Sequence, residues 1–226
     1  MEHSMREGEF IVETEIEYRG VRKEDMPEWG HGDTAKIVDG GPLEHDAPRI
    51  VANTKWSFRR VGVNMKTTFR QSGWPVELQR IGWRLVFATP KTDICYFACG
   101  PRDNYSDRKG GCFPAVYTQP SDLFGFAYGC SQDSGNREDA RFVCLQEPGI
   151  GFSSCGGRRF AFSVSPYSPT ELLRQCHPEL LPRPVKTELG LYAKVRGLGS
   201  ANCGPEPKAE DRLPPGGTFT LDVDWH

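Results

Sequence analysis

Apolar and polar residues alternate in several short segments of this chain, and each such segment predicts a β-strand. Residues 9–18, EFIVETEIEY, alternate apolar and acidic side chains from Ile11 or Val12 onward, as in a strand with one solvated face. Residues 54–58 and 65–69 flank a short turn at 60–64, which favours a hairpin. Similar patterns predict a core strand at 83–88, an alternating strand at 160–164, two late antiparallel strands at 189–195 and 218–225, and short apolar runs at 113–117 and 123–128.

One segment predicts a short helix. Residues 169–181 contain TELLRQCHPELL, in which Thr170 can cap the first turn and Pro178 can end it. Elsewhere short strands alternate with turn signals, since the chain has 25 Gly and 18 Pro. This arrangement is typical of an all-β fold, a β-sandwich with little helix.

Charge divides the chain into two unequal parts. Residues 1–46 hold 13 acidic and 5 basic residues, whereas residues 47–226 hold 17 acidic and 23 basic residues. We therefore expect an acidic N-terminal extension at 1–46, made of a strand and a turn-rich linker, ahead of one domain at 47–226. The basic residues are scattered, so no nucleic-acid partner is expected. No stretch approaches 18 apolar residues and no leader-like segment opens the chain, so we expect neither membrane insertion nor a signal peptide.

Half of the eight cysteines fall within the 36 residues from Cys95 to Cys130. A zinc site is disfavoured because none of the five histidines lies in this stretch and no paired CxxC spacing occurs. A catalytic cysteine is disfavoured because no Cys-His signature accompanies it. The even count instead favours a disulfide framework, although eight cysteines allow 105 pairings and spacing alone cannot choose among them.

Exposed loop chemistry is expected in the same stretch. Asn104-Tyr105-Ser106 forms a glycosylation sequon, which suggests a secreted surface. Aromatic residues in its loops are candidate interface anchors, and three basic residues form a small positively charged tip. The candidate binding residues are Arg102, Tyr105, Arg108, Lys109, Phe113, Tyr117 and Phe124. Trp56, Trp83 and Phe160, on apolar strands, are instead expected to pack in the core.

The order of motifs along residues 47–226 is similar to that of a known family. The segment APRIVANTKWSFRRVGVNMKTTFRQSGWP places Pro48, Val51, Asn53 and Trp56 in register with it. The motifs ACGPRDN, GGC and FGFAYGCSQDSG follow, then FVC, SSCGGRRFAFSV and a closing pair LGLYAKVRGLG and GGTFTLDV. Together these segments resemble the receptor-binding domain of gammaretroviral-type envelope surface subunits, viral or endogenous.

The resemblance implies a fold and a function. The fold would be an antiparallel, immunoglobulin-like β-sandwich with disulfide-tied loops. The function would be binding of a host cell-surface receptor, often a multipass transporter, by a non-enzymatic protein at the cell exterior or virion surface. Its partners would be that receptor and, in a full-length envelope, the fusion subunit. No cofactor and no metal would be needed.

The resemblance also implies disulfide pairs. Cys112–Cys130 and Cys144–Cys155 would be the first two, and Cys176–Cys203 would tie the helix loop to the last hairpin. Cys95 and Cys99 would remain as a possible local pair. The family cysteine five places before the position of Cys130 is Gly125 here, so one family bridge is absent.

Two other interpretations stay open. The chain could be a captured, truncated envelope domain that occupies a receptor and blocks infection. It could also be a secreted β-sandwich enzyme or inhibitor unrelated to viruses. A hydrolase would need an acid pair such as Glu138 and Asp139, and nothing in the sequence places a partner near them.

Overall fold

The computed structural model describes residues 2–6, 9–19, 49–72, 77–124, 134–175, 177–199 and 205–226. Within these ranges the chain forms strands with a few short helical turns. The strands are β1 (Glu2–Arg6), β2 (Glu9–Arg19), β3 (Arg49–Phe58), β4 (Val63–Ser72), β5 (Arg80–Phe87), β6 (Asp93–Gly100), β7 (Phe113–Pro120), β8 (Arg137–Ala140), β9 (Phe142–Leu145), β10 (Ile150–Ser154), β11 (Phe160–Ser165), β12 (Thr187–Val195) and β13 (Thr218–Trp225). The helical elements are α1 (Pro169–Arg174) and the 3-10 turns η2 (Ser121–Leu123), η3 (Pro178–Leu180) and η5 (Ala209–Asp211).

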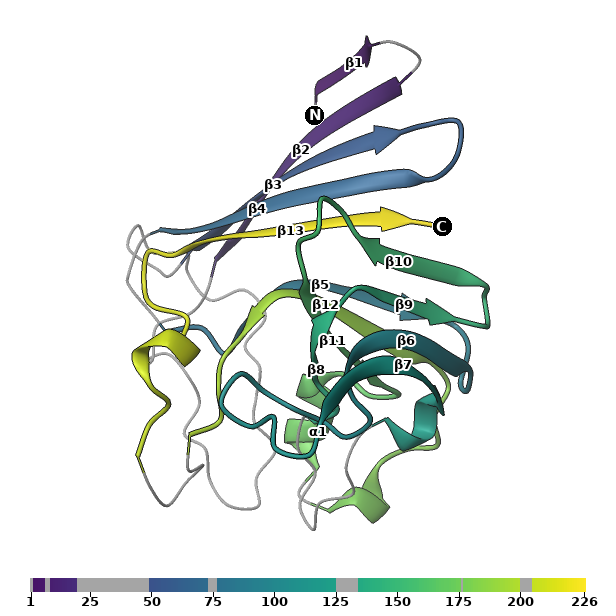
Figure 1. Cartoon of the computed structure of the whole chain (residues 1–226), viewed down its shortest axis with the longest axis vertical. Coiled ribbons are helices and arrows are strands. Elements are labelled where there is room, and N and C mark those ends of the chain that lie inside the picture. Colours follow the sequence, from purple (N-terminus) through teal and green to yellow (C-terminus); the bar gives the residue numbers. More distant parts are fainter. Residues whose placement is uncertain are drawn as a thin grey trace.

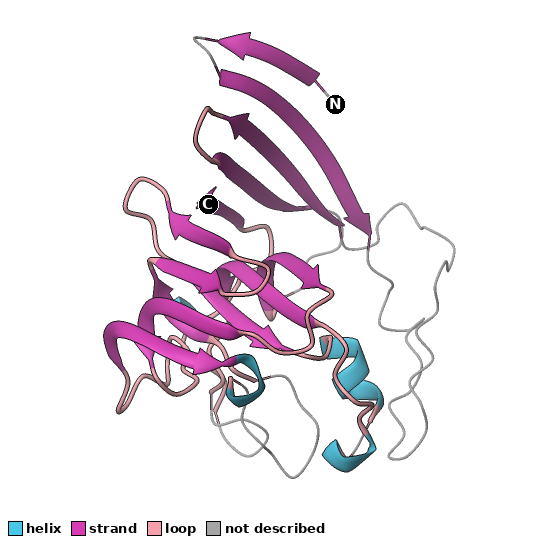
Figure 2. Ribbon diagram, turned by 90° about the vertical axis from the view of Figure 1, so that its right-hand side faces the viewer, coloured by secondary structure: helices cyan, strands magenta, loops and turns pink. Residues whose placement is uncertain are grey.

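Two antiparallel sheets make up the fold. The larger sheet has nine strands in the order β1-β2-β3-β4-β13-β10-β9-β6-β7, and the smaller has four in the order β5-β12-β11-β8. Figure 1 shows β1 to β4 fanning away from the body, while the smaller sheet lies beside the half of the larger sheet that contains β9, β6 and β7. Figure 2 shows the same separation from the side. The predicted all-β antiparallel sandwich is therefore confirmed.

Inward-facing side chains of both sheets form one apolar core. Alternate residues of β6, Ile94, Tyr96 and Ala98, are fully buried and meet residues of β11 and β12. Strand geometry explains this pattern, because successive side chains point to opposite faces. Burial of each large apolar side chain stabilises the fold by roughly 1.5–3 kcal/mol. Other core members are Phe69, Val143, Phe152, Phe162, Leu189, Leu191, Leu221 and Val223.

Several sequence-based strand predictions are confirmed, and two need correction. The hairpin at 54–69 is β3 and β4, and residues 160–164 form β11. Residues 83–88 were expected as a core strand but form most of β5, which is an edge strand of the smaller sheet. The two late strands, β12 and β13, do not pair with each other, because each belongs to a different sheet.

The predicted acidic strand is β2, and it is part of the larger sheet. Residues 10–19 of β2 pair with residues 49–58 of β3 in continuous antiparallel register. Glu13, Glu15 and Glu17 share one face, as the alternation predicted, and their side chains are exposed. The predicted linker at 20–47 lies outside the described residues, and the proposed division of the chain at residue 46 stays a prediction.

The predicted helix is present but shorter and capped differently. Ser168, rather than Thr170, is the N-cap: its hydroxyl accepts a hydrogen bond from Glu171 N, while the Glu171 carboxylate accepts one from Ser168 N. This reciprocal pair is a capping box. Burial alone would raise the pKa of Glu171, but the hydrogen bonds from Lys186 and Ser168 outweigh it and lower the pKa to about 2. Helix α1 ends at Arg174, and Pro178 begins η3.

The predicted disulfide-tied loops are not found among the described residues. Cys95, Cys99, Cys112, Cys144 and Cys155 are free thiols. Cys95 and Cys99 lie four residues apart on β6, and Cys155 lies four residues beyond Gly151, the partner of Cys144. Four residues of strand span roughly 13 Å, whereas a disulfide needs Cα atoms within about 7 Å. Neither of these predicted bridges can therefore form.

The other cysteine pairs fall partly outside the described residues. Cys130, Cys176 and Cys203 are not described, so the pairs Cys112–Cys130 and Cys176–Cys203 stay predictions, and Cys112 itself carries a thiol. Burial, together with nearby Cys95, raises the pKa of Cys144. Among the described residues, no helix is long and apolar enough to cross a bilayer.

Candidate functional site

The loop at 101–109 is held in place by the buried side chain of Asn104. Its Nδ2 donates to the carbonyl oxygens of Cys99 at 2.8 Å and Arg102 at 2.9 Å, and its Oδ1 accepts from Glu138 N at 2.9 Å. The residue has no exposed surface. A glycan needs an accessible amide on the protein surface. The amide of Asn104 is therefore inaccessible in the folded chain and serves as a structural hub, and its predicted glycosylation stays a prediction.

Asn136, just before β8, makes three further hydrogen bonds, two with Asn104 and one with Glu138. Asn104 N donates to Asn136 O at 2.9 Å, and Asn136 Nδ2 donates to Asn104 O and Glu138 Oε1, both at 2.8 Å. Burial raises the pKa of Glu138, although the bond from Asn136 opposes this. The two asparagines thus join the loop to β8 without any charge pair.

Asp107 joins the same loop to the segment after β12. Its Oδ1 accepts from Leu198 N at 3.0 Å, and its Oδ2 accepts from Gly199 N at 2.7 Å. A Cβ on Gly197 would lie 2.7 Å from the Asp107 carboxylate, so only glycine permits this approach. Three segments far apart in the sequence therefore meet around the loop.

A hollow of about 270 Å³ lies where these segments meet. Its polar wall includes Arg80, Asn136 and Ser163, and its apolar wall includes Tyr105, Val195 and Leu198. Two of the lining residues contact Tyr192: Arg80 Nη1 donates to Tyr192 Oη at 3.1 Å, and Tyr192 Oη lies 2.9 Å from Ser163 Oγ. The lining of the hollow is thus mixed, with Tyr105, Val195 and Leu198 packed together in one apolar cluster.

The charges next to the hollow neutralise each other. Arg196 Nε donates to Glu77 Oε1 at 2.7 Å, Arg196 also pairs with Glu206, and Arg212 Nε donates to Glu77 Oε1 at 2.8 Å. Hydrogen bonds from Arg212 and then Arg196 lower the pKa of Glu77 to about 2. This network ties the chain before β5 to the chain after β12.

The acid pair Glu138 and Asp139 does not form a dyad. The Asp139 carboxylate pairs with Lys109 Nζ at 2.7 Å and with Arg159 Nη1 at 3.6 Å, while Glu138 accepts from Asn136. Asp139 has φ of 59°, the left-handed region, which Asp tolerates better than most residues. Both acids therefore already have partners, and Asp139 shapes the end of β8.

The candidate receptor-binding residues do not form one exposed surface. Tyr105 and Phe124 are buried, with 8% and 1% exposure, and Tyr117 donates its hydroxyl to Phe113 O at 2.8 Å. Among these aromatic candidates, Phe113 has an exposed side chain, at 67%. The basic tip is partly neutralised, because Arg108 pairs with Asp103 and Lys109 pairs with Asp139, while Arg102 is exposed.

Sequence reasoning missed Arg137, a buried cation. Its side chain is 1% exposed, and its guanidinium lies 4.4 Å from the Phe124 ring centroid and 5.9 Å from that of Tyr96. It donates to Gln119 Oε1 and Phe124 O at 3.3 and 3.4 Å. No local pattern in the sequence distinguishes this arginine from the exposed ones nearby.

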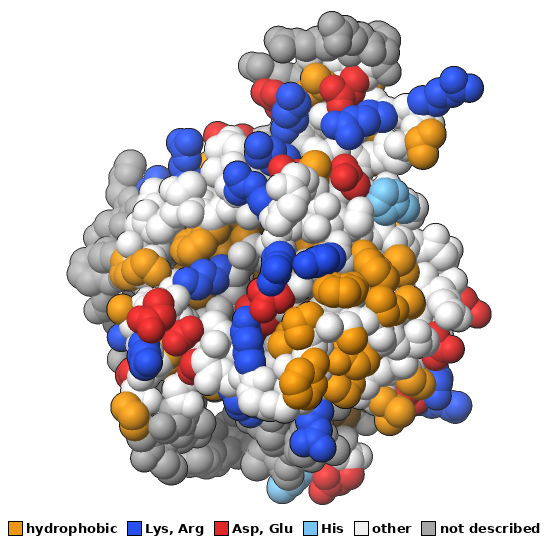
Figure 3. Space-filling model, in the orientation of Figure 1, with side chains coloured by type: hydrophobic (Ala, Val, Ile, Leu, Met, Phe, Trp, Pro, Cys, Tyr) orange, Lys and Arg blue, Asp and Glu red, His pale blue; other side chains and the backbone are white. Residues whose placement is uncertain are grey.

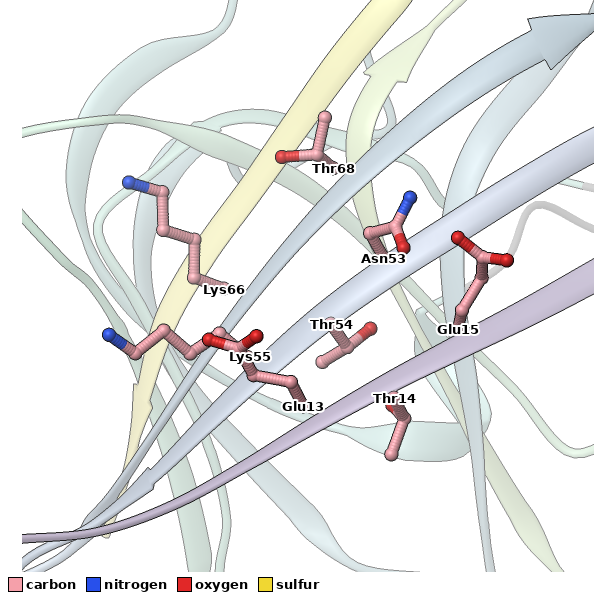
Figure 4. Close-up of a pocket in the computed structure, with 8 residues that line it drawn as sticks. All are labelled: Glu13, Thr14, Glu15, Asn53, Thr54, Lys55, Lys66 and Thr68. Carbon is pink, nitrogen blue, oxygen red and sulfur yellow. The ribbon is translucent and has the colours of Figure 1, made fainter. Parts of the chain in front are cut away.

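A second hollow, of about 490 Å³, lies on β2, β3 and β4 (Figure 4). It is lined by Glu13, Thr14, Glu15, Asn53, Thr54, Lys55, Lys66 and Thr68. Figure 4 shows Lys55 and Lys66 extending to the same side as Glu13. None of its described lining residues is aromatic; its two acids come from β2 and its two lysines from β3 and β4, as expected for a solvated sheet face. In the described part of the chain, no group of three His, Cys, Asp or Glu side chains could hold a metal ion.

The larger sheet has an apolar outer face over β6, β7 and β9. Facing away from the core are Cys95 and Phe97 of β6, Pro114 and Val116 of β7, and Phe142 and Cys144 of β9. Val116 is 59% exposed and the Arg141 guanidinium lies 4.8 Å from the Phe97 ring centroid. Figure 3 shows apolar side chains gathered over these strands.

Comparison with known proteins identifies a family for most of the chain. A family model described as "Beta galactosidase small chain" matches residues 17–225. A beta-galactosidase of Arthrobacter sp. (strain B7) is 29% identical over 141 residues, which cover 60% of this chain and 14% of that protein. A beta-galactosidase of Lactococcus lactis subsp. lactis (strain IL1403) is 26% identical over 168 residues, covering 74% of this chain and 16% of that protein.

A shorter relative carries the family name directly. The "Beta-galactosidase small subunit" of Latilactobacillus sakei is 30% identical over 167 residues, which cover 67% of this chain and 51% of that subunit. The chain thus spans about a seventh of the length of the first two relatives and half of the small subunit.

These matches overturn the functional predictions made from the sequence. The envelope resemblance is wrong, because the motifs that suggested it lie inside a region matched by a beta-galactosidase family. The viral receptor-binding function is therefore wrong as well. So are the host receptor and the fusion subunit as partners, and the expectation of a non-enzymatic protein. The open interpretation of a β-sandwich enzyme is closer. The predicted extracellular location stays a prediction. Because the family model covers residues 17–225, the chain belongs to the family of the beta-galactosidase small chain.

Proposed function

We propose that this chain is a β-sandwich component of a β-galactosidase and works in contact with a larger part that carries the hydrolytic acids. The observation that carries the proposal is the family match over residues 17–225, together with a relative named as a small subunit. The relatives named simply beta-galactosidase are about seven times longer than the matched region.

Three carboxylates on segments near the loop at 101–109 and the 270 Å³ hollow support this division between the two parts. Glycoside hydrolysis requires two carboxyl groups on either side of the scissile bond, one of them free to give up a proton. Glu77 is paired with two arginines, Asp107 accepts two backbone N–H groups, and Asp139 is paired with Lys109. These three carboxylates are engaged in structural contacts, and Glu138, whose pKa burial raises, accepts a hydrogen bond from Asn136. We therefore assign the proton transfer to the larger part.

The apolar outer face supplies a surface for that contact. Contiguous apolar side chains on a soluble protein mark interaction sites. Phe97, Val116 and Phe142 lie side by side on β6, β7 and β9, in direct cross-strand register. A large partner that covered this face would bury side chains that the sandwich itself leaves outside its core.

The test is an activity assay on the chain purified from its own cells through an affinity tag. The purified material should hydrolyse a fluorogenic β-galactoside, whereas the recombinant chain alone should not. Val116→Asp places a charge on the outer face and should lower the co-purifying activity about tenfold, as expected for a loss of about 1.4 kcal/mol of binding.

Val61→Asp is the matched control. Val61 lies in the turn between β3 and β4 and is 85% exposed, so this substitution should leave the co-purifying activity unchanged. Recovery of the intact chain without hydrolytic activity would contradict the proposed function. Equal activity for wild type and Val116→Asp would exclude this face as the contact.

A further inference from the structure

We propose that the 270 Å³ hollow bounded by Arg80, Tyr105 and Ser163 is a binding site for a single neutral pyranose ring. The inference rests on the hollow alone and needs neither hydrolysis nor a partner. It assigns this chain a carbohydrate-binding role of its own, separate from the assembly proposed above.

The direction of the hydrogen bonds leaves one donor unused. Arg80 can only donate, so Tyr192 Oη accepts from Arg80 Nη1. The Tyr192 hydroxyl proton is then available to Ser163 Oγ, which lies 2.9 Å away. In that arrangement the Ser163 hydroxyl proton has no acceptor among the described residues, and Ser163 lines the hollow. A ligand oxygen would accept it.

Asn136, in contrast, has a hydrogen-bond acceptor that lacks a donor in the described part of the chain. Its Nδ2 is assigned by two acceptors, Asn104 O and Glu138 Oε1, so Oδ1 is its carbonyl oxygen. This oxygen is buried and has no hydrogen-bond donor among the described residues. An unsatisfied buried acceptor is unfavourable for the folded chain. Asn136 lines the hollow, so we assign the missing donor to a hydroxyl of the ligand that enters it.

One outstanding donor and one outstanding acceptor favour a neutral ligand with hydroxyl groups. A phosphate or carboxylate could accept from Ser163 but could not donate to Asn136. The nearby Arg196 offers little positive potential to an anion, because Glu77 and Glu206 already pair with it. A sugar hydroxyl both donates and accepts, and so meets both needs.

Size and shape favour one ring. Pockets for drug-sized ligands usually measure about 300–1,000 Å³, and this hollow is slightly smaller, at about 270 Å³. Its apolar side, formed by Tyr105, Val195 and Leu198, suits the C–H face of a pyranose, while Arg80 and Ser163 lie among its polar lining. The loop at 101–109 and the segment 196–199 fix these walls through Asp107.

The test is a binding measurement on the full recombinant chain. Methyl β-D-galactoside and methyl β-D-glucoside are titrated by saturation-transfer NMR and calorimetry, with inorganic phosphate as the anionic probe. We expect saturable binding of at least one sugar, with a Kd on the order of 1 mM, as ligand-efficiency limits suggest for so small a molecule. Phosphate should not compete.

Two variants locate the binding. Ser163→Ala removes the unused donor and should weaken binding about tenfold, whereas Ser57→Ala, a buried serine on β3, should not. Gln79→Trp adds a bulky side chain at an exposed position on the rim and should abolish binding without disturbing the core. Gln146→Trp, at an exposed turn between β9 and β10, is its control.

Each outcome decides the inference. Sugar binding that is weakened by both hollow variants and by neither control supports it. No binding up to about one hundred times the expected Kd overturns it, as does sugar binding that is equal in Gln79→Trp and wild type. Phosphate binding without sugar binding would show an anion site instead. None of these results depends on β-galactosidase activity, so this inference and the proposed function can fail separately.

Discussion

Arg137 carries a positive charge into the core without a carboxylate partner among the described residues. Buried charges are costly unless paired or well hydrogen-bonded, and here two aromatic rings and four oxygen atoms compensate the guanidinium. A planar guanidinium suits this arrangement, because it stacks on a ring and donates in several directions within one plane.

Arg137→Lys should therefore destabilise the chain although the charge is kept. Lysine loses the stacking on Phe124 and at least one donor, for a cost of about 2–3 kcal/mol in free energy of unfolding. Urea denaturation followed by tryptophan fluorescence measures this. Arg158→Lys is the control, since Arg158 is exposed. An equal free energy of unfolding in Arg137→Lys and wild type would contradict this account of the buried cation.

Asn104 shows how a surface signal can encode an interior residue. The Asn-x-Ser sequence suggested a glycan, whereas both ends of the amide are used in the fold. Asn104→Asp keeps the shape but loses two N–H donors, leaving Cys99 O and Arg102 O with one partner fewer. We expect a loss of about 2–4 kcal/mol in free energy of unfolding. Asn53→Asp, on the outward face of β3, should stay within about 0.5 kcal/mol of wild type.

At the scale of elements, Glu77 joins the start of β5 to the end of β12 through Arg196 and Arg212. Its pKa is lowered from 4.5 to about 2, so the folded chain favours the ionised form. This stabilisation is fully present above pH 4.5 and is lost as the pH falls toward 2. Because Glu77 is partly solvent-exposed, we expect only about 1–2 kcal/mol.

Glu77→Gln should therefore reduce the free energy of unfolding at pH 7 by that amount, with a smaller difference from wild type at pH 3. Urea denaturation at both pH values measures the two differences. Glu15→Gln, on the exposed face of β2, should give no difference at either pH. A Glu77→Gln effect that does not shrink at pH 3 would show that the carboxylate charge is not its cause.

Strands with regular alternation were predictable, and those without it were not. The alternation of β2 and β11 was enough to predict a strand at each position, although β11 is buried on both faces and Ile16 and Tyr18 of β2 are exposed. β6 was missed because its sequence, DICYFACG, is apolar on both faces and reads as a cysteine-rich loop. Both faces are apolar because one lines the core and the other forms the apolar outer surface.

Contacts between distant segments were not predictable from one sequence. β12 and β13 look like a closing pair, yet their hydrogen-bonding partners are β5 and β11 for one and β4 and β10 for the other. The meeting of Asp107 with Leu198 and Gly199 has no local signature. The cysteine count suggested bridges, but strand geometry separates Cys95 from Cys99 and Cys144 from Cys155.

For the whole molecule, the proposed function places the chain in a β-galactosidase assembly. Short motifs of Gly, Pro and Cys misled the sequence interpretation, because turn residues recur in unrelated β-sandwiches. The family match over residues 17–225 carries more information, since it includes strands of both sheets. The apolar outer face over β6, β7 and β9 is the part of the molecule that this claim explains best.

The most direct measurement is β-galactoside hydrolysis across size-exclusion fractions of the chain purified from its own cells. The account predicts that the chain and the hydrolytic activity elute together, well ahead of a 25.3 kDa monomer. Elution of the chain at the monomer position, with the activity absent or in other fractions, would contradict it.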